Sequence, residues 1–136
     1  MTIQDRQEEI IQMFSELDDW MDKYEYIIGL GKSLKPMDPA LKTQTNLISG
    51  CQSRVWLDGA IVKGTMHLYA DSDALITKGL IHLLLRVLDR QPPEAILNAE
   101  LDFIDRTGLG ADLSPSRAHG LASIVKQIKT LAREKI

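Results

Sequence analysis

The chain has 136 residues, of which 44% are hydrophobic and 26% charged, and its net charge is −3. This composition is typical of one globular domain covering residues 1–136, and the small acidic excess argues against a nucleic-acid-binding protein. The N-terminus lacks the apolar core of a signal peptide, and no apolar stretch approaches the roughly 20 residues of a membrane span, so we expect a cytoplasmic protein with no membrane partner.

The first helix is expected over residues 4–17, where apolar side chains recur at helical spacing. Thr2 and Asp5 have the spacing of a capping box, in which each side chain accepts a hydrogen bond from the other's backbone. This pair therefore predicts where the helix begins.

A second helix is expected over residues 19–30, with Gly29 and Gly31 ending it. Residues 33–46 contain two prolines and few apolar side chains, so they are expected to form a long irregular loop. Long loops in compact domains are often functional.

A small antiparallel sheet is expected in the middle of the chain. Residues 55–57 and 61–62 are rich in β-branched and aromatic side chains, and residues 58–60 between them resemble a hairpin turn. Residues 65–69 have the same character and are expected to continue the sheet.

The central helix is expected over residues 73–89, with Asp71 and Asp73 as candidate N-caps. Paired catalytic carboxylates are an alternative role for these two residues. Apolar side chains cover most of the circumference of this helix, which is typical of a helix buried on all sides.

Helices are also expected to fill the C-terminal third. A short helix is predicted over residues 93–98, a further turn or two within 100–107, and a loop at 108–110. Ser114 and Pro115 predict the start of an amphipathic last helix, as N-cap and first helical residue. Helices that bracket a small sheet predict an α+β fold in one domain.

Cys51 is the single cysteine, which excludes an intramolecular disulfide and any metal site built from several of its own thiolates. Gly50 before it and Gln52 and Ser53 after it predict a turn just ahead of a strand. A lone cysteine is often only a small buried apolar residue. Its position on a loop and the nearby Arg54 favour instead a presented, thiolate-forming residue.

A thiol hydrolase would need a histidine beside Cys51 as the general base. The candidates are His67, His82 and His119, and no spacing among them indicates a dyad or a metal site. His82 is expected in the core and His119 at the surface. The hydrolase stays open as an alternative.

Arg117 lies four residues before Leu121 and seven before Ile124, so it shares the apolar face of the last helix. A cation in this position needs a partner or a site to serve. A structural alternative is an arginine that extends to solvent along its apolar stem or pairs with a nearby aspartate. The functional and the structural role both stay open from the sequence.

The segment from Gly50 to Trp56 resembles the signature of the SufE family of sulfur-acceptor proteins. Three further segments fit that family in order and spacing, so the resemblance covers nearly the whole chain. They are Trp20 with Tyr24 to Gly31, then Asp71 to Asp73 leading to Lys78, Gly79 and Leu80, and then Leu113 to Arg117 with Gly120 and Leu121. The resemblance implies a SufE/IscU-like fold, with a small sheet packed against several helices.

The resemblance also implies a function. Cys51 matches the residue that accepts persulfide sulfur from a cysteine desulfurase, and Arg117 is a candidate supporting residue. The residues implied to contact the partner are Gly50, Gln52, Ser53 and Arg54. Leu47 and Ile48, which precede the loop, are expected to shield the sulfur.

The implied partner is a SufS- or CsdA-like desulfurase that carries the PLP, so no cofactor is expected on this chain. The sulfur would then pass to an acceptor or scaffold in iron–sulfur cluster assembly. The alternatives are a CsdE-like carrier for another sulfur pathway and a cluster scaffold, although a scaffold generally needs several thiolates. A homodimer is left open.

Overall fold

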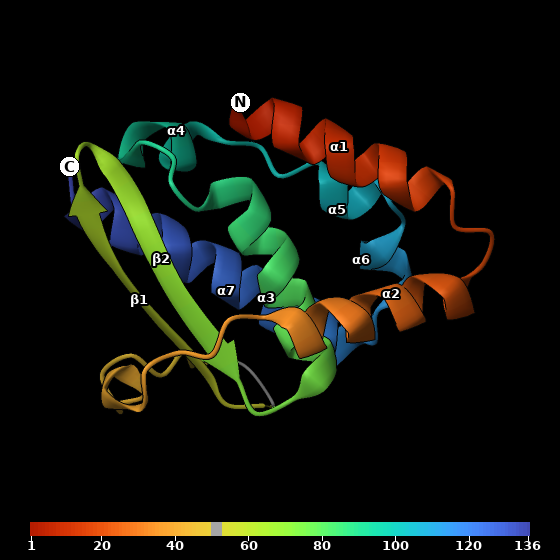
Figure 1. The fold of residues 1–136 in the computed structure, drawn as a ribbon, viewed down its shortest axis with the longest axis horizontal. Helices are drawn as coiled ribbons and strands as arrows, with labels where there is room; N and C mark the ends of the chain where they lie inside the picture. The colour runs from red at the N-terminus through yellow and green to blue at the C-terminus, as the bar shows by residue number, and fades with distance from the viewer. Residues whose placement is uncertain (50–52) are drawn as a thin grey trace.

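The computed structural model describes residues 1–49 and 53–136 (Figure 1). In chain order the elements are α1 (Ile3–Ser15), α2 (Trp20–Ser33), the 3₁₀ helix η1 (Pro39–Leu41), β1 (Val55–Val62), β2 (Thr65–Ser72), α3 (Leu75–Leu88), α4 (Pro93–Asn98), α5 (Phe103–Arg106), α6 (Leu109–Asp112) and α7 (Pro115–Glu134). Helices thus pack against one antiparallel hairpin, which confirms the predicted α+β class.

The two N-terminal helices form close to the predicted positions. The Asp5 N–H donates to Thr2 Oγ1 and the Thr2 N–H to Asp5 Oδ2, each at 3.0 Å, so the predicted capping box is confirmed. The prediction that Gly29 and Gly31 end the second helix is wrong, because α2 continues to Ser33. Gly31 lies instead where α2 meets α3, and a Cβ there would collide with the Leu75 carbonyl oxygen.

The hairpin turn falls at Lys63 and Gly64, not at the predicted residues 58–60. These two residues have φ angles of 52° and 83°, the positive values that a two-residue hairpin turn requires. Gly59 lies inside β1, opposite Leu68 on β2. A Cβ at Gly59 would come within 2.9 Å of the Leu131 side chain, so this glycine allows α7 to pack closely on the strand.

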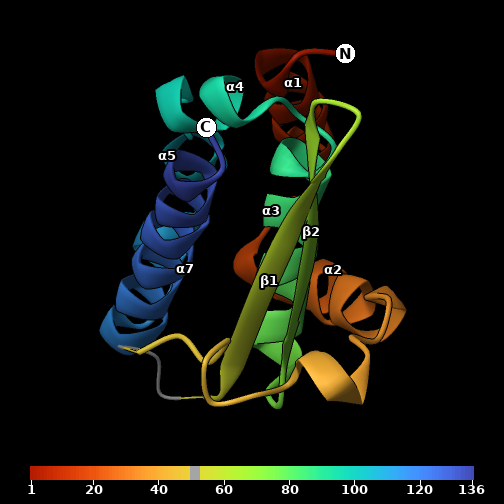
Figure 2. The same ribbon diagram turned by 90° about the vertical axis from the view of Figure 1, so that its left-hand side faces the viewer.

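Helix α3 is the centre of the molecule, as predicted. It contacts α1, α2, α7 and β2, and most of its side chains are buried. Figure 2 shows α7 running beside the hairpin, with α3 behind the hairpin. The capping prediction for Asp71 and Asp73 is wrong, because Asp71 lies in β2 and the N-cap residue of α3 is Ala74.

The C-terminal helices mostly follow the prediction. Helices α4 and α5 lie within the expected ranges, and Ser114 caps α7, with the Arg117 N–H donating to Ser114 Oγ at 3.3 Å. The loop predicted at residues 108–110 is wrong, since α6 begins at Leu109. Gly108 adopts a φ of 82° before it and Leu109 is buried, so a hydrophobic contact fixes this short helix.

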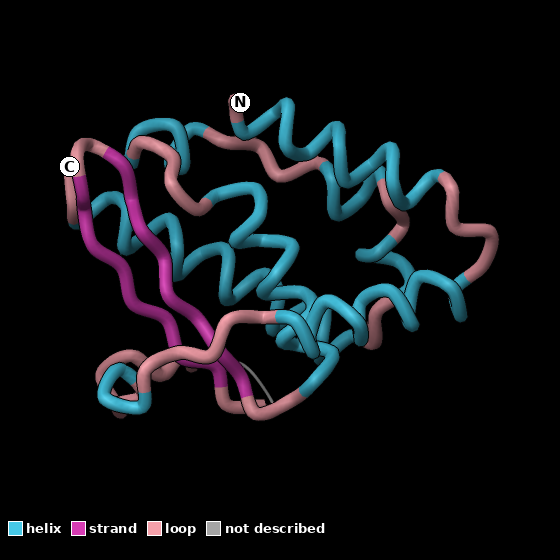
Figure 3. Tube along the Cα trace, viewed as in Figure 1, coloured by secondary structure: helices cyan, strands magenta, loops and turns pink. Residues whose placement is uncertain are grey.

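The connection from α2 to β1 follows the predicted irregular path, interrupted by the short η1. Figure 3 shows it at the end of the hairpin away from the Lys63–Gly64 turn. That end is also where the segment containing Cys51 joins β1.

Candidate functional site

Cys51, Gly50 and Gln52 lie outside the described residues, but both chain segments that lead to them are described. The Ile48 N–H donates to the Val55 carbonyl at 2.8 Å, and the Leu57 N–H donates to the Asn46 carbonyl at 2.9 Å. Residues 46–48 therefore pair antiparallel with the start of β1. Main-chain hydrogen bonds therefore join the segment that ends at Ile48 to the segment that begins at Val55.

The returning segment is held by the end of β2. The Arg54 N–H donates to Asp73 Oδ1 at 3.0 Å, and Ser72 Oγ donates to the Arg54 carbonyl at 2.7 Å. Sequence reasoning missed this role of Asp73, because an aspartate just before a helix is most simply explained as an N-cap. The Arg54 side chain itself is exposed.

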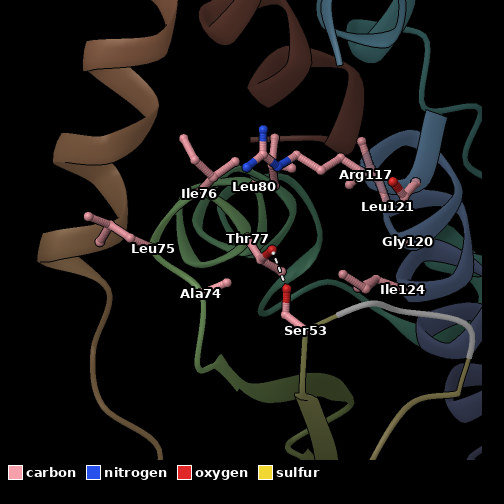
Figure 4. A pocket seen from close by; sticks show the side chains of 11 residues that line it. Ser53, Ala74, Leu75, Ile76, Thr77, Leu80, Arg117, Gly120, Leu121 and Ile124 are labelled. Atoms are coloured by element: carbon pink, nitrogen blue, oxygen red, sulfur yellow. Dashed lines mark hydrogen bonds between the residues drawn. The ribbon is translucent and has the colours of Figure 1, made fainter. Parts of the chain in front are cut away.

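A pocket of about 250 Å³ lies between the first turns of α3 and α7, and Ser53 lines one side of it (Figure 4). Ser53 Oγ is 3.4 Å from Thr77 Oγ1, a contact that connects the returning segment to α3. The remaining lining is mostly apolar. It consists of Ala74, Leu75, Ile76, Leu80, Ser116, Arg117, Gly120, Leu121 and Ile124.

Arg117 reaches over this pocket from the first turn of α7 toward Ile76 and Leu80 (Figure 4). Its side chain is exposed, and within residues 1–49 and 53–136 it forms no ion pair or hydrogen bond. The described part of the chain thus provides no carboxylate partner, and the exposed side chain agrees with the alternative in which Arg117 extends to solvent. A role of Arg117 at the pocket stays a prediction.

Leu47 and Ile48 occupy different surroundings from those of Ser53. Ile48 belongs to the hydrophobic core, and both residues line a separate pocket of about 310 Å³ with Leu131 of α7. Their shielding of the Cys51 sulfur stays a prediction. The apolar side chains around Ser53 are instead Leu80, Leu121 and Ile124.

The histidines do not gather at this pocket. His82 is half-buried with its Nδ1 2.9 Å from the Leu30 carbonyl oxygen, and His119 is exposed as predicted. None of the described residues that line the pocket is a histidine, and the thiol hydrolase stays an untested alternative. The described residues contain no group of three side chains suited to hold a metal ion, and no described helix is long and apolar enough to cross a membrane.

Comparison with known proteins identifies the family. Residues 8–132 match the SufE family model, described as an Fe–S metabolism associated domain. A SufE-like protein of Synechocystis is 37% identical over 123 residues, which cover 90% of this chain and 77% of the relative. A SufE-like protein of Rhizobium meliloti is 34% identical over 134 residues, covering 95% and 96%.

Two further relatives extend the comparison. Arabidopsis SufE-like protein 1, named as chloroplastic/mitochondrial, is 37% identical over 126 residues, and the chain spans 34% of its length. The solution structure of a hypothetical protein from Thermus thermophilus shares the fold, with a TM-score of 0.78 at 20% identity over 95% of this chain and 94% of that one. Since the family model spans most of the sequence, and relatives above 30% identity match over most of their length, the chain belongs to the SufE family, whose domain is associated with Fe–S metabolism.

Proposed function

We propose that this protein accepts the outer sulfur of a persulfide from a cysteine desulfurase onto Cys51 and passes it on for iron–sulfur cluster assembly. One observation carries the proposal. The single cysteine of a SufE-family chain lies between two segments bonded to the hairpin, and its close neighbour Ser53 lines an apolar pocket that Arg117 overhangs.

The chemistry needs one thiolate on this protein. The Cys51 thiolate attacks the outer sulfur of the desulfurase persulfide, a new S–S bond forms, and the desulfurase cysteine leaves as a thiolate. Cys51 becomes a persulfide with no added oxidant, and PLP stays with the partner enzyme. With a single cysteine, the chain has no second thiol to convert this persulfide into an intramolecular disulfide.

The lining of the pocket is suited to a persulfide sulfur. Leu80, Leu121 and Ile124 give an apolar surface beside Ser53, and such a surface limits access of water and oxidants. The Arg117 guanidinium lies at the same pocket and carries a permanent positive charge. A nearby cation favours a thiolate or a persulfide anion over the protonated form.

Intact-mass spectrometry tests the proposal. After incubation with a cysteine desulfurase and L-cysteine, the wild-type protein should gain about 32 Da, one sulfur, and lose it again on reduction. Peptide mapping should place the adduct on the segment containing Cys51. An unchanged mass with a panel of SufS- and CsdA-like desulfurases would contradict sulfur acceptance.

Arg117→Ala should slow sulfur uptake by about tenfold, because the charge-assisted interaction with the sulfur or with the desulfurase is lost. Arg117→Lys should recover only part of the rate, because lysine offers a point charge in place of a planar fork. Single-turnover uptake measured by quenched mass spectrometry gives these rates.

Arg133→Ala is the matched control, since Arg133 is an exposed arginine on the same helix that does not line this pocket. It should leave uptake unchanged. Thermal unfolding of all three variants separates function from stability. A lower Tm for Arg117→Ala with normal uptake by the folded protein would make Arg117 a structural residue.

A further inference from the structure

Asp71 is a buried carboxylate that the proposed sulfur chemistry does not use. Only 3% of its surface is exposed, and it lies in β2 directly opposite Trp56 of β1. Lys42 Nζ is 3.1 Å from its Oδ2, and Lys78 Nζ is 3.8 Å from its Oδ1. Burial by itself would raise the pKa of Asp71, but hydrogen bonds from the Ser72 N–H, Lys42 and the Met37 N–H outweigh it and lower the pKa.

Two of these contacts come from one segment, residues 34–48, which we call the strap. It follows α2 in the chain, and both the Met37 N–H and Lys42 Nζ bind Asp71 Oδ2. Lys42 Nζ also lies 5.2 Å from the centroid of the Trp56 ring, within the range of a cation–π interaction. Lys42 therefore connects the strap to both strands of the hairpin.

The end of the strap is the segment that leads to Cys51. Leu47 lies opposite Trp56, and Trp56 lies opposite Asp71, so these three residues form one row across the strap, β1 and β2. The Ile48–Val55 hydrogen bond comes directly after this row. The ion pair thus attaches the strap to the hairpin in the same row as Leu47, just before the segment that contains Cys51.

The Asp71 carboxylate is buried, whereas the Lys42 side chain at the other end of the pair is partly exposed. Without Lys42, Asp71 keeps Lys78 and the N–H groups of Ser72 and Met37. The strap, by contrast, loses one of its two contacts with this carboxylate and keeps the Met37 N–H. Since β2 is paired along its length with β1, the strap is the segment that then becomes easier to displace.

On the basis of the proposed function, we infer that Asp71 and Lys42 are positioning residues for sulfur transfer. Their ion pair holds the strap on the hairpin and so fixes the point from which the chain departs toward Cys51. Lys78 pairs with the same carboxylate but belongs to α3, not to the strap.

The test compares Lys42→Met with Lys78→Met. Both variants remove one cation from the same carboxylate, and both keep an apolar stem of similar length. Hydrogen exchange followed by NMR should show the Ile48 and Leu57 amides exchanging about tenfold faster in Lys42→Met, as expected when a local opening becomes easier. Lys78→Met should leave both amides as in the wild type, and Lys42→Arg should restore protection.

The functional readout is the concentration of this protein that gives half-maximal sulfur uptake from the desulfurase. This concentration should rise about fivefold in Lys42→Met, with the maximal rate retained, and should stay unchanged in Lys78→Met. A displaced strap weakens formation of the productive complex with the desulfurase, but it does not alter the chemical step once that complex has formed. Should Lys42→Met not fold, Lys42→Gln serves in the same comparison.

Equal exchange in the two methionine variants, or unchanged uptake by Lys42→Met, would overturn the inference. A wild-type protein that takes up no sulfur would overturn the proposed function instead. The exchange measurement needs no desulfurase, so it still decides whether the ion pair holds the strap.

Discussion

Replacing Cys51 with serine is expected to abolish sulfur uptake and any stimulation of the desulfurase. A serine hydroxyl does not form the S–S bond on which the transfer depends, and no other cysteine in the chain replaces it. The intact mass of Cys51→Ser after incubation with desulfurase and cysteine should equal that of the untreated variant. A Cys51→Ser protein that stimulates the desulfurase as well as wild type would show an allosteric activator and not a carrier.

Ser49→Ala is the control for this substitution. Ser49 is an exposed residue two positions before Cys51, so alanine there removes a nearby hydroxyl group while the thiol stays. Uptake should stay within about twofold of wild type, because substitutions at exposed positions usually change stability by less than about 0.5 kcal/mol. Circular dichroism of both variants checks that the fold is retained.

Gly79→Ala is expected to lower the free energy of unfolding by more than about 3 kcal/mol, or to prevent folding. A Cβ at Gly79 would collide with the Ile27 carbonyl oxygen and lie 2.5 Å from Ile27 Cγ2. Both atoms belong to the buried contact between α2 and α3, so relief requires the two helices to separate. Urea unfolding monitored by circular dichroism measures the change.

Gly29→Ala gives the matched comparison on the same pair of helices. Apart from the adjacent backbone of α2, no atom of the described residues lies within 4 Å of a Cβ at Gly29, and the residue is exposed. Alanine favours a helix interior over glycine by about 1 kcal/mol, so Gly29→Ala should be neutral or stabilising. If Gly79→Ala unfolds at the same urea concentration as Gly29→Ala, the close helix contact is not a requirement of the fold.

The sequence by itself determined the features that depend on local or periodic patterns. Thr2 and Ser114 marked helix starts because capping uses atoms within one turn of the chain. The nearly continuous apolar surface of residues 75–88 predicted the buried central helix, since only a position enclosed by other elements removes all of it from water. The segment around Cys51, together with three further segments in the same order and spacing, indicated the family, because each of these motifs is contiguous in the sequence.

The tertiary structure decided the roles that depend on partners distant in sequence. Gly59 and Gly31 resembled a turn and a helix end, but helix packing explains both, because glycine leaves room for the Leu131 side chain at one position and for the Leu75 carbonyl at the other. Asp71 resembled a helix cap, but strand pairing buries it beside Lys42. The pocket that brings together Ser53, Leu80 and Arg117 follows from how α3 packs beside α7, and no local pattern encodes a contact between segments so far apart in the chain.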